Sequence, residues 1–231
     1  FGLPGSSTFW SFQAFVTALR VLEELGMRVL LPEARQIYAA AGAKVVDDMV
    51  FIGKDIVRAA LASAPKRWRL RAPNPLRDQD YAQGNMIFMA GVGCPNATDR
   101  ERGRRPGSQA DFVETVKLCQ HYDVIHMLGP MTESQDVPIH LRHYATIQAQ
   151  LEYSDKPLFL YSRGPGQVQQ GFDLIQTALN LSDAEFTGDV WVSTVINTNS
   201  PRQLDDPMAQ GLIDFARAGQ MCIVTPFCLA G

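Results

Sequence analysis

The sequence has no uninterrupted apolar run approaching the roughly 18 residues that a membrane-spanning helix requires. Its first residues, Phe1-Gly2-Leu3-Pro4, hold no basic region followed by an apolar stretch, so no signal peptide is visible. These two absences favour a cytoplasmic protein that has no membrane partner.

The sequence also has few cysteines and little net charge. The 231 residues include four cysteines, set among apolar residues: Cys94, Cys119, Cys222 and Cys228. Buried thiols in a reducing compartment are the favoured interpretation. The formal net charge is -3, which gives no electrostatic reason to expect nucleic acid as a partner.

The chain begins without Met and ends on Leu229-Ala230-Gly231, directly after a strand-like run. We therefore expect it to be part of a longer protein. Its composition, 46% hydrophobic and 19% charged, is that of a globular chain with enough apolar material for a sizeable core. The length suits one large α/β domain with an N-terminal appendage.

Residues 1–84 are interpreted as that appendage, a helical segment with a small hairpin that packs on the rest. Apolar residues at helical spacing predict three helices, over 12–25, 32–41 and 56–61. Gly26 and Gly42 stand where the first two helices should end, and Pro65 stops the third. Residues 44–52 predict a hairpin turning at Asp47-Asp48, and 68–71 a half-exposed strand.

From residue 85 to 231 the pattern changes to five apolar runs, each followed by Gly, Pro, Ser, Thr or Asn. They cover 86–90, 124–128, 158–161, 190–196 and 221–224. Helical patterns fill the gaps, at 108–119, 141–151, 172–179 and 207–215. Ser108 with Asp111 resembles a capping box, and Pro207 and Gly219 bracket the last helix.

The runs recur about every 30–40 residues, which is the length of a βαβ unit. Strands that are apolar on both faces indicate a parallel sheet covered by helices. We prefer the first five strands of a βα barrel to a doubly wound open sheet, because Gly91-Val92-Gly93 lacks the third glycine of a dinucleotide-binding turn.

In a βα barrel the active site lies at the C-terminal ends of the strands. This rule selects the residues that follow the five runs: Gly91, Gly93, Cys94, Pro95 and Asn96; Gly129, Pro130 and Gln135; Tyr161, Ser162 and Arg163; Asn197 and Asn199; Thr225, Pro226 and Phe227. The set contains no carboxylate pair, no lysine suited to a Schiff base and no histidine.

Other conspicuous residues have plainer interpretations. His126 lies within an apolar run and is expected to be a hydrogen-bonded core residue. His140 and His143 share a helix face but have no third ligand nearby in sequence, so packing or solvation is favoured over a metal site. Residues 99–105 suit a solvated turn, and Gly164-Pro165-Gly166 is weak support for an anion site. Tyr161 and Phe227 suit core packing as well as cation binding.

A series of short segments resembles one enzyme family, the trimethylamine/glycine betaine corrinoid methyltransferases, in the same order and spacing over nearly the whole chain. These segments are Ala39–Ala43 with Val45-Val46-Asp47, Ala62–Lys66, Arg71–Pro75, Arg105-Pro106, Asp111-Phe112, Gln135–Pro138, and Thr146 through Asp155-Lys156-Pro157.

The resemblance implies a (β/α)8 TIM-type barrel that binds a methylated amine at its mouth. A separate corrinoid protein would dock there and accept the methyl group on Co(I), so the cobalamin-type cofactor belongs to the partner and no metal bound by this chain is expected. A quaternary amine such as a betaine is the preferred substrate. We also expect a homo-oligomer and a role in one-carbon metabolism such as methanogenesis.

For the site, the resemblance favours groups that hold a cation without acid–base chemistry. Tyr161, Asn197 and Asn199 suit that task, and Arg163 suits a betaine carboxylate. The further substrate-binding candidates are Gly93, Cys94, Asn96, Gln135 and Phe227, with Cys94 inserted in a glycine- and proline-rich family loop. Family members acting on trimethylamine carry pyrrolysine late in the barrel, in a stretch beyond Gly231.

Two other functions stay open from the sequence. One is a lyase or aldolase type of barrel enzyme, which needs an acid–base or Schiff-base residue on later strands. The other is a catalytically silent barrel that binds a small cation. Tight betaine binding without methyl transfer would distinguish the second.

Overall fold

The computed structural model describes residues 6–91, 93–162, 164 and 166–226. These residues form two compact units, each described by itself. The N-terminal unit comprises the described chain up to Pro65, with Asn197–Ala209 and Pro226, and the central unit comprises Lys66–Ile196 with Gln210–Thr225. The boundary expected after residue 84 stays a prediction.

The N-terminal unit is built on a four-stranded sheet of order β10-β1-β3-β2. Its elements are α1 (Ser6–Arg20), a π-helical turn (Val21–Leu25), β1 (Met27–Val29), α2 (Pro32–Ala40), β2 (Lys44–Val46), β3 (Met49–Phe51), α3 (Lys54–Ser63) and β10 (Gln203–Leu204). β3 pairs antiparallel with β1 and β2, and β10 pairs parallel with β1. The side chains of Val29 and Val50 are fully buried at the centre of this sheet.

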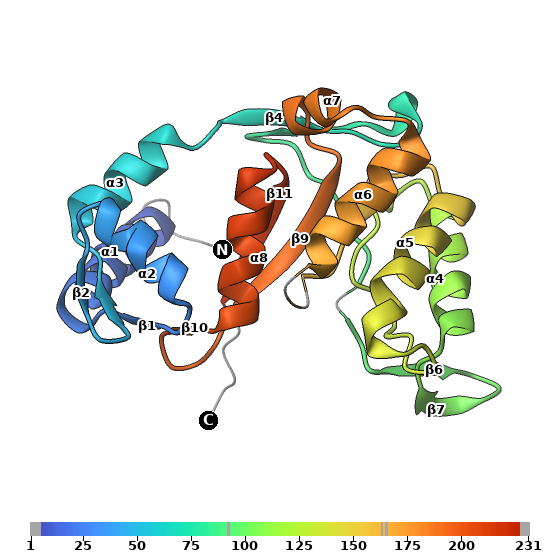
Figure 1. Ribbon diagram of the computed structural model, residues 1–231, viewed down its shortest axis with the longest axis horizontal. Coiled ribbons are helices and arrows are strands. Elements are labelled where there is room, and N and C mark those ends of the chain that lie inside the picture. Colours follow the sequence, from blue (N-terminus) through green and yellow to red (C-terminus); the bar gives the residue numbers. More distant parts are fainter. Residues whose placement is uncertain (1–5, 92, 163, 165, 227–231) are drawn as a thin grey trace. The chain divides into compact units, whose positions relative to one another are not determined.

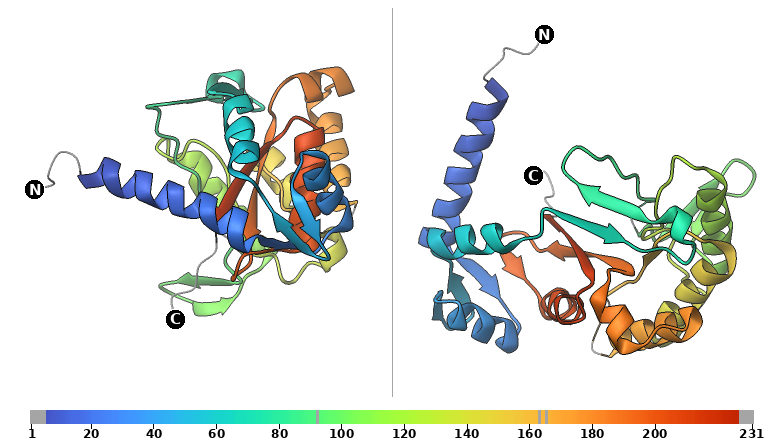
Figure 2. Two further views of the ribbon diagram at one scale, coloured as in Figure 1. Left: turned by 90° about the vertical axis from the view of Figure 1, so that its left-hand side faces the viewer. Right: turned by 90° about the horizontal axis from the view of Figure 1, so that it is seen from above.

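The three predicted helices and the hairpin of this segment are confirmed. Pro32 occupies the first turn of α2, and the hairpin turns at Asp47-Asp48, where Asp47 has a φ of 54°. Gly26 ends the first helix with a φ of 68° and a ψ of −178°, so it has the positive φ expected but not the αL conformation. The N-terminal half of α1 extends away from the rest of its unit (Figure 2). Phe12 and Phe15 of this helix are exposed.

The central unit alternates strands with helices after two hairpins. The hairpins are β4 (Arg67–Leu70) with β5 (Gln79–Ala82), joined through a 3-10 turn (Pro75–Arg77), and β6 (Asn96–Asp99) with β7 (Gly103–Pro106). They are followed by α4 (Gln109–His121), a second 3-10 turn (Ile139–Leu141), α5 (Arg142–Tyr153), β8 (Leu158–Phe159), α6 (Gln167–Leu179) and α7 (Asp183–Gly188). The last three elements are β9 (Val192–Thr198), α8 (Asp206–Arg217) and β11 (Met221–Pro226), and each of them continues into the N-terminal unit at one end.

Three of the five predicted strands form a sheet of order β11-β9-β8, in which β8 and β9 are parallel. The prediction of strands at 86–90 and 124–128 was wrong in detail, because these segments share a single parallel bridge, Met89 with Met127. The ladder fails because the Phe88 amide donates to the Nδ1 atom of His126 instead of to a carbonyl, at 2.9 Å.

The order of the segments nevertheless follows the chain. The 86–90 segment bridges to 124–128, Leu128 donates its amide to the Pro157 carbonyl at 3.1 Å, and β8, β9 and β11 follow. A doubly wound sheet would reverse this order at its switch point. Within the described residues the row does not close, so a mixed α/β fold is observed and a barrel only in part.

Helices α4, α5 and α6 lie side by side along one face of this row (Figure 1). The buried core between them and the strands includes Phe112, Ile147, Phe172 and Leu158. The capping box predicted at the start of α4 is confirmed, with Ser108 and Asp111 bonded in both directions.

The hairpin of β4 and β5 packs where the strands begin. Leu70 bridges to Val190 just before β9 and is buried in one cluster with Met127 and Met221. Trp68 stacks on Tyr81 at 5.1 Å between ring centroids. Apolar side chains therefore cover the N-terminal end of the row, which leaves the opposite end for a site.

Candidate functional site

The loop after the first strand segment contacts the end of β8. The Gly93 amide donates to the Pro130 carbonyl at 2.5 Å, which ties this loop to the loop after the second segment. A Cβ atom on Gly93 would lie 3.3 Å from the Tyr161 hydroxyl. Glycine thus allows the backbone to approach Tyr161 closely, and the structure brings these two predicted residues together.

Three more predicted residues belong to the same cluster. Cys94 accepts the Glu133 amide at its carbonyl, at 2.8 Å, and the Gln135 side-chain amide donates to the Pro95 carbonyl. Asn96 begins β6 directly after them, paired with Pro106.

Cys94 is exposed, so the expectation of a buried thiol was wrong there, because it lies on a loop surface rather than in a strand. Cys119 is buried and Cys222 half-buried, and burial raises the pKa of the Cys222 thiol to about 12.

Arg142, at the start of α5, holds the loop that carries Gln135. Its guanidinium donates to the carbonyls of Val137 and Gln135, at 2.7 and 3.1 Å, and to the Glu133 carboxylate at 2.7 Å. The two side chains of this ion pair are 18% and 13% exposed, so it is largely shielded from water. This role of Arg142 was not predictable from the sequence, because an arginine at a helix start has no local pattern.

Tyr161 lies half-buried beneath this loop. Its hydroxyl donates to the Met131 carbonyl at 3.3 Å, and its ring meets Phe159 edge-on at 5.0 Å. A cavity of about 10 Å³ adjoins it, lined by Thr132, Glu133, Ser134, Arg142, His143, Thr146 and Tyr161. That volume is close to the minimum for one water molecule.

His143 is the titratable member of the buried polar residues that line this cavity, with Ser134 and Thr146. Its Nε2 atom lies 2.9 Å from the Gln170 side-chain oxygen, and its Nδ1 atom has no protein partner within the described residues. Burial lowers the pKa of His143 below its ordinary value, since the charged imidazolium is poorly solvated there. The ring is therefore neutral at pH 7. A packing role, as expected, suits it better than metal binding.

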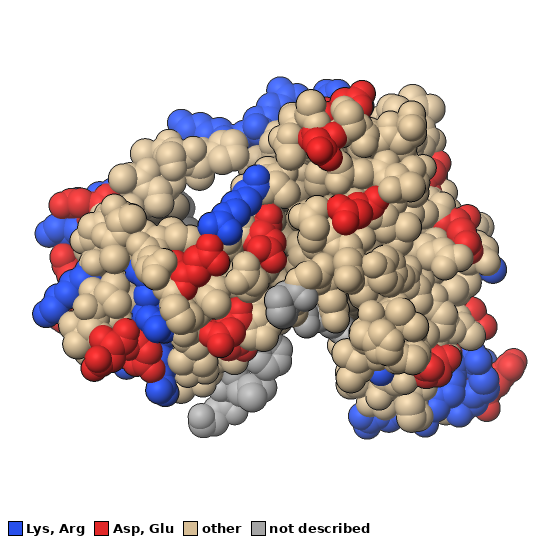
Figure 3. Space-filling view, in the orientation of Figure 1, with Lys and Arg blue, Asp and Glu red and all other residues tan. Residues whose placement is uncertain are grey.

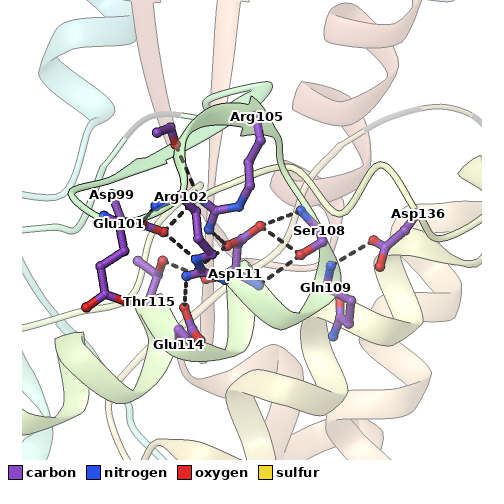
Figure 4. A network of polar contacts seen from close by, with 11 residues as sticks. Asp99, Glu101, Arg102, Arg105, Ser108, Gln109, Asp111, Glu114, Thr115 and Asp136 are labelled. Atoms are coloured by element: carbon purple, nitrogen blue, oxygen red, sulfur yellow. Dashed lines mark hydrogen bonds and ion pairs between the residues drawn. The ribbon is translucent and has the colours of Figure 1, made fainter.

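Residues 99–105, expected to be a solvated turn, form the exposed turn of the β6–β7 hairpin at 100–102 together with the adjoining strand ends, and they also carry an ion-pair network (Figure 4). Arg105 bonds to Asp99 and to Asp111 of α4. Hydrogen bonds from the Arg102 backbone, then from the Arg102 and Arg105 side chains, lower the pKa of Asp99 to about 2. The opposed charges largely neutralise one another, and Figure 3 shows acidic side chains beside the basic ones over this hairpin. The network braces the start of α4 and leaves no strong field at the site.

The remaining predicted residues lie elsewhere. Asn197 and Asn199 are exposed and belong to the N-terminal unit. Arg163 and Phe227 lie outside the described residues. The structure thus brings together Gly93, Cys94, Asn96, Gln135 and Tyr161, and gives no placement of the two asparagines relative to them.

The acidic side chains nearest this cluster are already engaged. Glu133 pairs with Arg142, and Asp136 accepts the amide of Gln109 at the start of α4, at 2.7 Å. His126 is hydrogen-bonded as predicted, since it accepts the Phe88 amide, but it is half-buried and not a core residue. No group of three or more His, Cys, Asp or Glu side chains in the described part of the chain is arranged to hold a metal ion. What the cluster offers is uncharged: amide and carbonyl dipoles and an aromatic ring.

Sequence comparison defines the class to which this scaffold belongs. The family described as trimethylamine methyltransferase (MTTB) matches residues 15–231. The chain belongs to this methyltransferase family, and the expected family resemblance is confirmed.

Two individual relatives refine the comparison. A protein named glycine betaine methyltransferase from Desulfitobacterium hafniense (strain Y51) is 28% identical over 214 residues, which is 92% of this chain and 44% of that protein. A protein named trimethylamine methyltransferase MttB from D. hafniense (strain DSM 10664 / DCB-2) is 23% identical over 224 residues, 95% of this chain and 45% of that protein. The chain therefore spans less than half the length of these curated relatives.

No helix in the described ranges is both long enough and apolar enough to cross a membrane.

Proposed function

We propose that this chain is part of an enzyme that moves a methyl group from a quaternary amine, such as a betaine, to the corrinoid of a partner protein. The observation that carries the proposal is the uncharged cluster of Gly93, Gln135 and Tyr161 at the strand ends of a chain in the trimethylamine methyltransferase family. The relative that is 28% identical is named for glycine betaine, which favours a betaine over trimethylamine.

Such a reaction needs little acid–base chemistry from the protein. The carbon–nitrogen bond breaks with its electron pair left on nitrogen, so a quaternary ammonium leaves as a neutral tertiary amine and no proton has to move. A reduced corrinoid, when bound, supplies the nucleophile that accepts the methyl group. The protein's task is to hold the cation with one methyl group directed outward, which is positioning work.

The described residues suit this division of labour. Tyr161 offers an aromatic ring, and the Gln135 amide offers a dipole that can face a cation without neutralising it. Gly93 and Cys94 are exposed, which leaves the strand ends open to a second protein. Within the proposal, the strand row is the first part of a (β/α)8 barrel, whose remaining strands complete the site.

The test uses the full-length protein with its partner corrinoid protein in the reduced state. Glycine betaine, other betaines, trimethylamine and dimethylamine are supplied one at a time, and the cobalt absorbance is followed. We expect methylation with at least one quaternary amine. No change with any substrate would sink the proposal, and tight betaine binding without methyl transfer would instead indicate a cation-binding barrel.

A further inference from the structure

The small cavity that adjoins Tyr161 lies wholly within the central unit. Its walls come from three elements: the loop residues 132–134, the first turns of α5, and Tyr161 directly after β8. Its volume of about 10 Å³ is near the minimum for one water molecule and far below the volume of a betaine. The cavity is therefore not a substrate site, and it can hold one very small molecule.

His143 brings an unsatisfied polar atom to this cavity. The residue is 3% exposed, and its Nε2 atom lies 2.9 Å from the Gln170 side-chain oxygen, so Nε2 carries the proton of the neutral ring. The Nδ1 atom is then a hydrogen-bond acceptor, and no group of the described residues donates to it. Because an unpaired polar atom is costly in a protein interior, Nδ1 indicates a bound molecule that can donate a hydrogen bond.

The hydroxyl groups around the cavity already donate to other acceptors. The Ser134 hydroxyl donates to the Gln109 side-chain oxygen at 2.7 Å, and the Thr146 hydroxyl donates to carbonyls of its own helix at 2.8 and 3.2 Å. The oxygens of these two hydroxyls carry lone pairs that can accept from a water. A single water can therefore donate one hydrogen to Nδ1 of His143 and the other to a hydroxyl oxygen, whereas an anion has no hydrogen to give.

We propose that the cavity holds one ordered water that donates to Nδ1 of His143, and that His143 acts through this water as a positioning residue for Tyr161. The water fills the space between α5 and the Tyr161 side chain, and His143 is itself held by Gln170 of α6. The Tyr161 ring thereby keeps one orientation toward its ligand. The inference rests on the proposed function only for the identity of that ligand, a quaternary ammonium. His143 is buried and touches no substrate.

A high-resolution crystal structure of the full-length protein tests the water directly. We expect one peak of electron density in the cavity, at about 2.7–3.2 Å from Nδ1 of His143. An empty cavity, or a protein group bonded to Nδ1 in place of a water, would overturn the proposal.

Two substitutions of His143 separate the tasks of its two ring nitrogens. In His143→Gln the side-chain amide can still donate to Gln170, but no acceptor remains at the Nδ1 position. In His143→Asn an oxygen lies near the Nδ1 position, and the bond to Gln170 is lost. We expect crystals of His143→Gln to lack the water and to show a displaced Tyr161 ring, and crystals of His143→Asn to keep both in place. Any other pattern would overturn the positioning role.

Glycine betaine binding adds a readout that a merely structural role would not move. Calorimetry on the full-length protein compares His143→Gln alone with His143→Gln combined with Tyr161→Leu. We expect His143→Gln to raise the betaine Kd about three- to tenfold in the wild-type background, and by less than about twofold where Tyr161 is already replaced, because both changes act on one contact.

Unchanged affinity of His143→Gln would overturn the positioning role. Equal weakening in both backgrounds would also overturn it, because a general loosening of the unit would explain that result. Should the wild-type protein transfer no methyl group, the proposed function fails. The density at Nδ1 and the orientation of the Tyr161 ring in the two variants then still decide this proposal.

Discussion

Gly211 lies on α8 where the helix faces the end of β8. A Cβ atom there would lie 1.7 Å from the Ser162 Oγ atom and 2.6 Å from its Cβ atom. We expect Gly211→Ala to lower the free energy of unfolding by about 1–3 kcal/mol, although alanine favours a helix over glycine, because the helix must move off the strand. Urea unfolding of the full-length protein measures the change.

Gly188 supplies the control for this substitution. It ends α7 and has no atom within 4 Å of an added Cβ, so Gly188→Ala should be neutral or slightly stabilising. The double variant Ser162→Gly with Gly211→Ala should regain stability over Gly211→Ala alone. If the stability losses of the two single variants simply add in the double variant, the contact between residue 211 and Ser162 is not the cause of the destabilisation.

The buried His143 makes stability depend on pH. Because burial lowers its folded pKa, the folded state stays neutral while the unfolded chain takes up a proton near the ordinary value of about 6.5. Stability is therefore full above that value and is lost as the pH falls from about 6.5 toward the folded pKa. His143→Gln should flatten this part of the profile, measured as the free energy of unfolding between pH 7 and 5.

His140, one turn before His143 and exposed, is the comparison. His140→Gln should change the slope of the wild-type profile only slightly, because the His140 charge is the smallest of the influences on the pKa of His143. A profile that flattens equally in both variants would argue against burial of His143 as the origin.

Tyr161 is the aromatic residue of the described cluster. If its ring holds the cation, Tyr161→Leu should weaken glycine betaine binding about 2- to 30-fold, which is the range for one cation–π contact. Tyr161→Phe keeps the ring and loses the hydroxyl that bonds to the Met131 carbonyl, so its loss of affinity should be smaller. Calorimetry measures the betaine affinity of both variants, with Tyr153→Leu at the exposed end of α5 as control. Equal losses of affinity in Tyr161→Leu and Tyr161→Phe would assign the effect to the hydroxyl and not to the ring.

At the scale of an element, a buried lysine from outside α4 binds the C-terminal end of this helix. Lys156 is 1% exposed, and its Nζ atom donates to the carbonyls of Cys119 and Tyr122, at 2.5 and 2.9 Å. These carbonyls belong to the last turn of the helix, where cations are favourable. We expect Lys156→Met to cost roughly 2 kcal/mol or more and to speed amide exchange in that turn. Lys117→Met, at an exposed position of the same helix, should cost much less.

Helix ends were predictable, and strand pairing was not. Ser108 and Asp111 mark the start of α4 within a few residues of sequence, so a local pattern was enough. The strand predicted at 86–90 fails through a bond between Phe88 and His126, 38 positions apart, which no local pattern contains. The β6–β7 hairpin was missed because its residues are polar and charged, without the apolar alternation of a half-buried strand.

For the whole molecule, the proposed barrel makes a prediction about its first strand. Met86 is 74% and Phe88 46% exposed in this chain. A closed barrel would cover that edge with a late strand and its helix. In the full-length protein with Cys94→Ser, we expect Met86→Cys to react slowly with a maleimide. Leu76→Cys, at a position 92% exposed here, should react fast; equal fast labelling would contradict closure.

Part of the candidate site followed from one rule about strand ends. Gly93, Gln135 and Tyr161 were selected because they follow apolar runs, and the structure brings them together. What holds the loop of Gln135 was not predictable, since Arg142 acts on carbonyls whose positions depend on the folded backbone. Nor did the sequence show that Asn199 belongs to the N-terminal unit, because β10 is only two residues long.

Beside β10, the Arg202 side chain donates to the Leu25 carbonyl, a bond between residues 177 positions apart. During synthesis at about 5–20 residues per second, β1 therefore waits roughly 10–35 s for the strand that completes its sheet. Over that interval its free edge is open to pairing with other chains. Protection of the nascent chain thus matters more for this sheet than for α4, whose cap and first turn leave the ribosome together.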